Sequence, residues 1–234
     1  MHENIYVFIA PSRTSSATVR QALIEEFPNE VFIFTPDIGL NGRQATSMDR
    51  LIESAKHCAH RFYCGHMAFG VDCYFERKVS YFTIYRDPVD RVLSSYDALS
   101  RIGAVTDKIE DWINTAFDAR NGMVKRLCGF DVWQDLGPFD FRKQRLLSDD
   151  FEAGPEHLEL AKQTVDEHID LVLSQGRFPE SLVLLQRYLG SRALFSLYHQ
   201  NMIWSKENTI FVFKFLKISK KFLPGSEFEI FSIS

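Results

Sequence analysis

The chain has 234 residues, of which 45% are apolar and 25% are charged, and its formal net charge is −4 at pH 7. A chain of this length forms one well-buried domain without needing a second, so we expect a single domain over residues 1–234. The slightly acidic balance argues against nucleic-acid binding, which depends on a basic surface. Any anion site must therefore be local.

The first apolar run is residues 5–10, with Glu3 before it and Pro11 after it. A signal peptide needs a basic start and a longer apolar region, and a membrane anchor needs about 20 apolar residues. We therefore expect no membrane span and a cytoplasmic protein, although a catalytic fragment cut from its anchor would give the same pattern.

Buried strands and amphipathic helices alternate along the chain. Residues 5–10 form an unbroken β-branched and aromatic run, which is typical of a strand buried on both faces. Further strands are expected at residues 31–34, 61–65 and 79–85. Four sets of apolar residues recur at helical spacing: Val19, Ala22, Leu23 and Phe27; Met48, Leu51, Ile52, Ala55 and Cys58; Val89, Val92, Leu93 and Tyr96; and Ile109, Trp112, Ile113, Ala116 and Phe117.

Two of these helices have capping signals at their starts. Pro88 stands where a helix begins, with Asp87 as its N-cap. Thr46 with Asp49 forms a plausible capping box for the helix that comes after a loop containing Asn41 and Gly42.

The last third of the chain leaves one assignment open. Residues 169–173 either continue the helix before them or form a late strand, because Gly176 and Pro179 interrupt the pattern directly after them. The helical apolar positions on either side are Leu158, Ala161 and Val165, and then Leu182, Leu185 and Leu189 before Gly190. Residues 201–234 are an atypical aromatic and lysine-bearing tail without clean periodicity, on which we build no function.

This alternation predicts an α/β fold with a central, mostly parallel sheet and helices on both faces, which makes three layers. In such sheets, ligands bind at the carboxyl ends of the strands. Candidate functional residues are therefore sought directly after each strand.

The four cysteines (Cys58, Cys64, Cys73 and Cys128) have no CxxC spacing, and we expect buried free thiols. His57, Cys58 and His60 are of residue types that bind metal ions. However, Cys58 lies on the apolar stripe of its predicted helix and no second ligand pair follows, so we expect no metal site.

The loop after the first strand is a candidate anion site. It has neither the spacing nor the lysine of a Walker A motif, which argues against an ATPase or GTPase. Its backbone N–H groups and hydroxyls can surround an oxyanion at the start of a helix. The residues are Arg13, Thr14, Ser15, Ser16, Ala17 and Thr18. The alternative is an ordinary N-cap cluster with a solvated Arg13.

The segment after the strand at residues 79–85 is a second and more specific candidate. Arg86 ends the strand, Asp87 begins a helix, and Ser94 lies eight residues after Arg86. A guanidinium fork and a hydroxyl are suited to a phosphate. Alternatively, Arg86 or Arg91 pairs with a neighbouring aspartate. Two anion sites in one domain indicate a ligand with two separated anionic groups, such as a nucleotide-type donor.

His66 is the third candidate, because it comes directly after the strand at residues 61–65. An imidazole titrates near neutrality and can accept a proton from a hydroxyl at working pH. A structural role is the alternative.

The spacing of these segments resembles the sulfotransferases that use 3′-phosphoadenosine 5′-phosphosulfate (PAPS), and within them the carbohydrate branch that includes heparan and dermatan 2-O-sulfotransferases. The first loop resembles the family's Pro-Lys-Thr-Gly-Gly-Thr loop if Ser12 is an insertion. Gly65-His66 resembles the family's Gly-His, and residues 86–96 match its RxPxxRxxSxY segment. Residues 121–129 and 178–182 match further segments, so that the resemblance covers roughly residues 4–201.

The resemblance implies a P-loop-like fold, PAPS as co-substrate, a carbohydrate-type acceptor and no metal. It implies that Arg13 stands in place of the family's lysine and stabilises the leaving phosphate, that Arg86 and Ser94 hold the 3′-phosphate, and that His66 is the general base. Two departures matter. Arg13 is never deprotonated, so it cannot donate a proton, and Ser15 and Ser16 replace flexible glycines.

Two other functions remain open at this point. A kinase would need a Mg²⁺ site and a phosphate-loop lysine, neither of which is evident. A weak or inactive nucleotide-binding homologue is favoured by the altered loop and the tail. Nothing in the sequence names the acceptor or the oligomeric state. Aromatic residues that are candidates for stacking on a sugar, and equally for the core, are Phe69, Tyr74 and Trp133.

Overall fold

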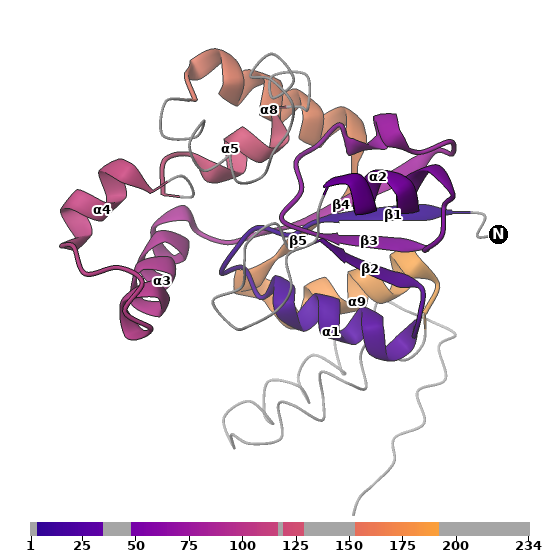
Figure 1. Ribbon diagram of the computed structural model, residues 1–234, viewed down its shortest axis with the longest axis horizontal. Coiled ribbons are helices and arrows are strands. Elements are labelled where there is room, and N and C mark those ends of the chain that lie inside the picture. Colours follow the sequence, from indigo (N-terminus) through magenta and orange to yellow (C-terminus); the bar gives the residue numbers. More distant parts are fainter. Residues whose placement is uncertain (1–3, 35–47, 117–118, 129–152, 192–234) are drawn as a thin grey trace, which may run out of the picture.

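The structure, a computed structural model, describes residues 4–34, 48–116, 119–128 and 153–191 (Figure 1). The expected loop at Asn41-Gly42, the cap at Thr46 and residues 201–234 lie outside these ranges. The single domain over residues 1–234 therefore stays a prediction.

Five strands form one parallel sheet in the order β2-β3-β1-β4-β5. The strands are β1 (Ile5–Ile9), β2 (Val31–Phe34), β3 (Phe62–Gly65), β4 (Val79–Tyr85) and β5 (Ile169–Ser174). The four strands predicted with no alternative are confirmed. The open assignment at residues 169–173 resolves as a strand, because the preceding helix ends at His168.

Helices cover both faces of the sheet. Successive side chains of a strand point to opposite faces, so a strand of apolar residues needs a helix layer on each face. On β1, Tyr6 and Phe8 pack under α1 (Ser16–Glu26) and α9 (Phe178–Leu189), whereas Val7 and Ile9 face α2 (Met48–Lys56), α5 (Gly122–Leu127) and α8 (Pro155–His168). Figure 1 shows the two groups of helices on opposite sides of the sheet. The predicted three-layer α/β fold is confirmed.

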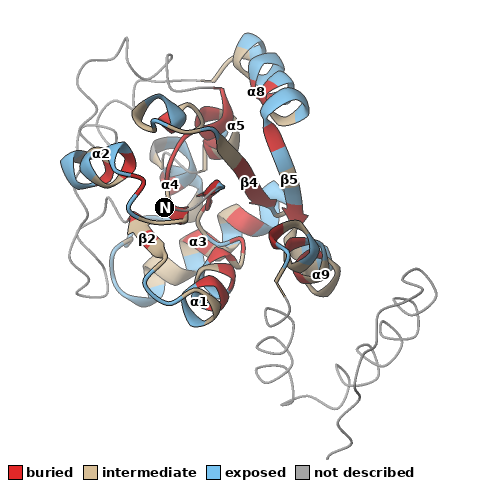
Figure 2. Cartoon of the chain, turned by 90° about the vertical axis from the view of Figure 1, so that its right-hand side faces the viewer, coloured by how far each residue is buried: buried red, intermediate tan, exposed pale blue. Residues whose placement is uncertain are grey.

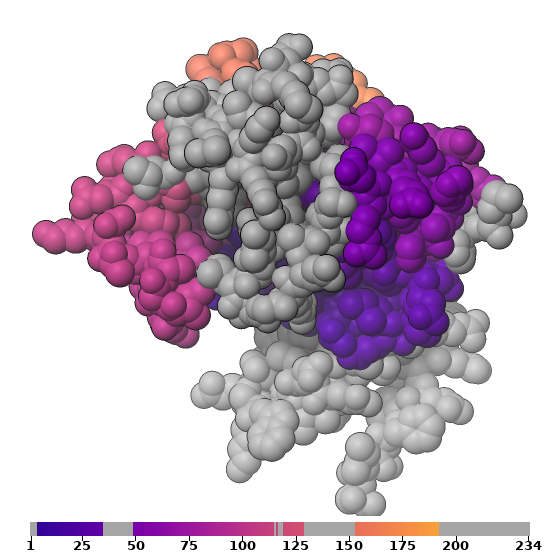
Figure 3. Space-filling view, in the orientation of Figure 1, coloured from indigo at the N-terminus to yellow at the C-terminus, as the bar shows by residue number. Residues whose placement is uncertain are grey.

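Two further helices, α3 (Pro88–Arg101) and α4 (Ile109–Thr115), lie beyond the carboxyl ends of the strands (Figure 1). The Tyr96 ring packs on Trp112 at 5.5 Å between centroids, and the Tyr96 hydroxyl donates to the Asp107 carbonyl at 2.9 Å. In Figure 3 the surfaces of α3 and α4 (pink) lie on the opposite side of the molecule from those of α1 and α2 (indigo and purple). Two short 3₁₀ turns, at Val71–Tyr74 and Gln175–Arg177, complete the described elements.

The apolar positions that indicate α3 do not all lie on its buried side. Val89 is 64% exposed and Leu93 is 48% exposed, whereas Arg91 and Ser95 are buried. The reason is that α3 projects from the end of the sheet and does not lie on one of its faces. Figure 2 shows the same contrast with α1 and α9, whose inner sides are buried.

Smaller corrections concern the cysteines and one leucine. Cys58 lies beyond the end of α2, in a left-handed conformation with φ 43°, although it is buried as expected. Cys73 is exposed, while the other three thiols are buried. Leu158 is 42% exposed on the outer side of α8, whereas Ala161 is buried.

The end of α9 agrees closely with the sequence pattern. Leu182, Leu185 and Leu189 are buried, and the helix ends at Gly190 with φ 65°. Within the described segments, no helix combines the length and the apolar character needed to cross a bilayer.

Candidate active site

The strand order brings the three candidate segments to one edge of the sheet. β1 is the central strand and pairs with β3 on one side and β4 on the other, so that Ile9 is in register with both Gly65 and Thr83. The loop after β1, His66 and Arg86 therefore start side by side. The chain leaves β1 toward β2 and β3 and later returns to add β4 on the other side of β1. A reversal of this kind opens a crevice at the carboxyl ends of two neighbouring strands.

The loop after β1 has an unusual backbone. Arg13 and Ser15 both adopt left-handed conformations, with φ 62° and 63°. Such conformations are unfavourable for residues with a Cβ atom and persist only where the surroundings enforce them, often at functional sites. Left-handed residues within a tight turn form concave rows of backbone N–H groups that bind anions. The sequence prediction of an anion loop is therefore compatible with the backbone, even though the glycines are absent.

Two of the predicted loop hydroxyls are used within the loop itself. The Thr14 and Ser16 hydroxyls donate to the Pro11 carbonyl, at 2.8 and 3.0 Å, and both residues are buried. Their protons hold the turn closed. The donors left for a ligand are the amides at the start of α1, which lack acceptors within the helix, on Ser16 and on the exposed Ala17. Thr18, also exposed, donates its own amide to the Ser15 carbonyl at 3.1 Å.

The segment after β4 begins as predicted. The Asp87 carboxylate accepts hydrogen bonds from the amides of Val89 and Asp90, both at 3.0 Å, and Pro88 is the first helical residue. Asp87 is therefore the N-cap of α3. Because this carboxylate caps the helix, Arg86 is available for another role.

Two hydrogen bonds join the two predicted anion segments. The Arg86 Nη1 atom donates to the Arg13 carbonyl at 2.9 Å, and the Arg13 Nε atom donates to the Ser94 hydroxyl at 3.1 Å. The Arg86 Nε atom is buried and has no hydrogen-bond acceptor among the described residues. Arg13, Arg86 and Ser94, predicted from separate segments, thus form one hydrogen-bonded cluster beyond the carboxyl ends of β1 and β4.

His66 lies on the other side of β1, at the end of β3, and is half-buried. The residue before it must be glycine, since a Cβ atom on Gly65 would lie 2.1 Å from the Phe34 carbonyl oxygen on β2. The His66 carbonyl accepts a hydrogen bond from the Arg126 Nη1 atom at 3.1 Å. The backbone that carries the imidazole is therefore held from both the sheet and α5.

Arg126 is not among the residues predicted for the site, although its segment is part of the resemblance. The sequence nevertheless contains a signal that points to this residue. Lys125 and Arg126 are consecutive basic residues in a short helix in which the flanking residues Val124 and Leu127 contribute to the core. Charged side chains are seldom buried unless they have partners, so a basic pair in such a helix indicates a specific contact.

The aromatic candidates for sugar stacking belong to the core where they are described. Phe69 lies between the rings of Tyr81 and His168, at 5.0 and 5.2 Å, and Tyr74 packs against the same cluster. Trp133 lies outside the described residues.

Among the described residues, neither a thiolate nor a metal cluster is found near these segments. Burial raises the pKa of the Cys64 thiol from 9.0 to about 12, and the nearby Arg20 charge only partly opposes this, so the thiol stays neutral. His60, one of the three residues considered as metal ligands, has its Nδ1 atom 2.9 Å from the Ser54 hydroxyl, within hydrogen-bond distance. In the described part of the chain, no three His, Cys, Asp or Glu residues come together as a metal site.

Comparisons with known proteins add little. No protein-family model matches the chain, and no curated protein matches it. Among solved structures, mouse sulfotransferase SULT7A1 complexed with PAP aligns with 97% of this chain and 86% of its own, at 11% identity and a TM-score of 0.34. A likeness this weak carries no argument, so the fold rests on the strand order and the site on its own geometry.

Proposed function

We propose that the chain is a sulfotransferase that moves a sulfuryl group from PAPS to a hydroxyl of a carbohydrate-type acceptor. The observation that carries the proposal is the cluster beyond the carboxyl ends of β1 and β4, in which Arg86 bonds to the Arg13 carbonyl and Arg13 bonds to the Ser94 hydroxyl. Two guanidinium groups beside a helix N-terminus suit a ligand with two separated anionic groups, and PAPS is such a ligand.

In this proposal the segment after β4 holds the 3′-phosphate. Arg86 has a buried Nε atom without an acceptor among the described residues, and an incoming phosphate oxygen would supply one. The Ser94 hydroxyl accepts from Arg13, which leaves its own proton for a phosphate oxygen. The Asp87 cap fixes the start of α3 and thereby the position of both side chains.

The loop after β1 would hold the 5′-phosphosulfate. Its donors are the amides at the start of α1 and the Arg13 guanidinium, whose terminal N–H groups are not used in the bond from Nε to Ser94. A guanidinium is always charged and stabilises negative charge that develops on the leaving phosphate. It does not supply a proton, so the phosphate leaves as an anion.

His66 would act as the general base. The acceptor oxygen forms a bond to sulfur while the bond from sulfur to the phosphate oxygen breaks, and the acceptor proton passes to the imidazole. His66 and the loop after β1 begin on neighbouring strands in register, and this supports a base and a donor at the same edge of the sheet. Holding the reactants in line contributes several kcal/mol to lowering a barrier of this kind.

The test is transfer of labelled sulfate from PAPS to a panel of mono- and oligosaccharides, with separate reactions containing ATP and Mg²⁺. The proposal predicts sulfated sugar with PAPS and no phosphorylated sugar with ATP. Phosphorylation that depends on Mg²⁺ would replace it with a kinase. Tight binding of adenosine 3′,5′-bisphosphate without transfer to any acceptor would replace it with an inactive nucleotide-binding protein.

A further inference from the structure

The turn that carries His66 is attached to α5 at two points by one residue. The Arg126 side chain donates to the His66 carbonyl at 3.1 Å, and the Arg126 carbonyl accepts from the Phe69 amide at 2.8 Å. Between these points, Met67 and Ala68 are each only 1% exposed. The two middle residues of the four after β3 are therefore packed inward, and this turn is held at both ends.

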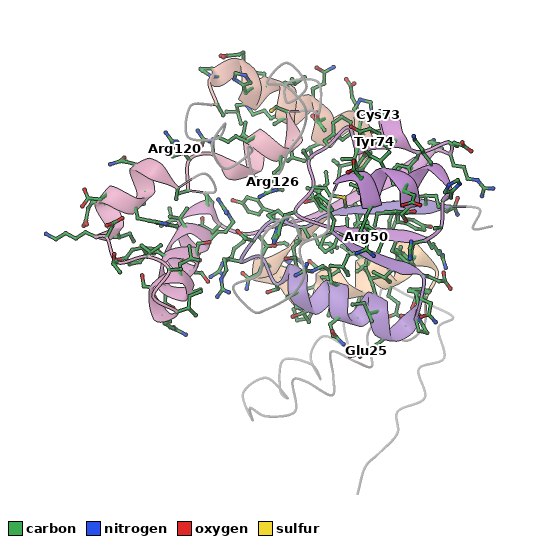
Figure 4. All side chains as sticks on the ribbon, viewed as in Figure 1. Glu25, Arg50, Cys73, Tyr74, Arg120 and Arg126 are labelled. Atoms are coloured by element: carbon green, nitrogen blue, oxygen red, sulfur yellow. The ribbon has the colours of Figure 1, made fainter. Side chains whose placement is uncertain are left out.

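Arg126 is well placed to make this contact rigid. It is 5% exposed, and its neighbour Leu127 is part of the core that α5 shares with the sheet and α8. In Figure 4, Arg126 lies on the side of α5 that faces the sheet, whereas Arg120 lies on the connection toward α4. A buried guanidinium forms a strong, charge-assisted hydrogen bond with a carbonyl oxygen, and little solvent is present to weaken it.

The bond acts on the peptide plane that comes after His66. A carbonyl held by a fixed donor resists rotation, so the ψ angle of His66 is restrained, and with it the direction of the Cα–Cβ bond. On the other side of His66, the sheet leaves no space for a Cβ atom at Gly65. The imidazole is thus carried on a backbone that is constrained before and after it.

We propose that Arg126 is the residue that positions His66. It acts through the main chain and contacts neither PAPS nor the acceptor substrate. This inference rests on the proposed function for its catalytic meaning, since a general base must lie within hydrogen-bond reach of the proton it accepts. A displacement of about 1 Å in such a group reduces turnover about 10²-fold.

The test compares Arg126→Met, which fills the same space without donors, with Arg126→Lys, which keeps a charged donor. The matched control is Arg101→Met, because Arg101 is exposed and pairs with Asp97 on the surface of α3. Three quantities are measured: kcat and KM for sulfuryl transfer, the affinity for adenosine 3′,5′-bisphosphate, and the NMR signal of the His66 imidazole. That signal is assigned by its loss in His66→Gln from among the seven histidines.

The inference predicts that Arg126→Met lowers kcat about 10²-fold, leaves the nucleotide affinity at the wild-type value, and shifts or broadens the His66 signal. Arg126→Lys should recover most of kcat and should shift the His66 signal less than Arg126→Met does. If Arg126→Met does not fold, Arg126→Lys alone must show a smaller loss in kcat with a shifted signal.

Two results would overturn the inference. One is an Arg126→Met protein whose kcat and His66 signal equal those of Arg101→Met. The other is a loss of nucleotide affinity that accounts for the whole loss of activity while the His66 signal stays unchanged, which would indicate general structural damage. If the wild type transfers no sulfate, the proposed function fails, but the NMR comparison still decides whether Arg126 holds His66.

Discussion

Gly65 offers a sharp test of how the sheet holds the candidate base. A Cβ atom added there would lie 2.1 Å from the Phe34 carbonyl oxygen and 2.9 Å from the Phe34 carbonyl carbon. Carbon and carbonyl oxygen approach no closer than about 3.3 Å even in favourable contacts, so β2 and β3 would have to separate by about 1 Å. Because backbone atoms cannot rotate away, the substitution Gly65→Ala must distort the parallel pair.

We expect Gly65→Ala to destabilise the fold by about 3 kcal/mol, the upper end of the usual range for overpacking. The assay is urea unfolding monitored by circular dichroism. With a urea m-value near 3 kcal/mol per M for a chain of this size, the midpoint should fall by about 1 M. Turnover should fall as well, because His66 is the next residue.

The matched control is Gly176→Ala. A Cβ atom there meets nothing closer than the Ser174 hydroxyl oxygen at 3.9 Å, so its unfolding midpoint should stay at or slightly above that of the wild type. If Gly65→Ala unfolds at the same urea concentration as Gly176→Ala, the close approach of β2 and β3 is wrong, and so is the proposed way in which His66 is held.

The site and the core give three further predictions. His66→Ala should reduce turnover by ~10²–10⁴-fold while nucleotide affinity is kept, and a loss below about tenfold in a folded protein would remove His66 from the role of base. Asp87→Ala removes both capping bonds of α3 and should destabilise the fold by about 1 kcal/mol, seen as a lower melting temperature; an unchanged melting temperature would contradict the capping role. Burial raises the pKa of Cys64 from 9.0 to about 12, so the folded state keeps its proton where the unfolded chain loses it. The contribution of this thiol to stability is therefore fully present below pH 9 and lost as the pH rises from 9 toward 12. The urea midpoint should fall between pH 8 and pH 10.5, and it should fall less in Cys64→Ala than in the wild type.

Local signals in the sequence were sufficient for most elements of the fold. The β-branched run at β1 and the Asp87-Pro88 start of α3 depend on neighbouring residues alone, and both are confirmed. In α3, Val89 and Leu93 have the spacing of a buried face, yet both side chains are exposed. Whether such a face is covered depends on where the helix lies relative to the sheet, and periodicity contains no information about that.

The candidate site was predictable in its parts and not in its connections. Arg13, Arg86 and His66 were each identified from their position after a strand. The bond from Arg13 to Ser94 joins residues 81 positions apart, and the bond from Arg126 to His66 joins residues 60 positions apart. Contacts over such distances depend on strand order, which one sequence does not reveal. The inward orientation of the Thr14 hydroxyl likewise depends on the turn closing onto Pro11.

The central claim is that the cluster of Arg13, Arg86 and Ser94 beyond the carboxyl ends of β1 and β4 binds a nucleotide with two separated anionic groups. Calorimetric titration with adenosine 3′,5′-bisphosphate tests it most directly, comparing the wild type with Arg86→Ala and with the surface control Arg101→Ala. We expect micromolar binding by the wild type and the control and a collapse of binding in Arg86→Ala. No binding by a folded wild type, or equal binding by Arg86→Ala, would contradict the claim.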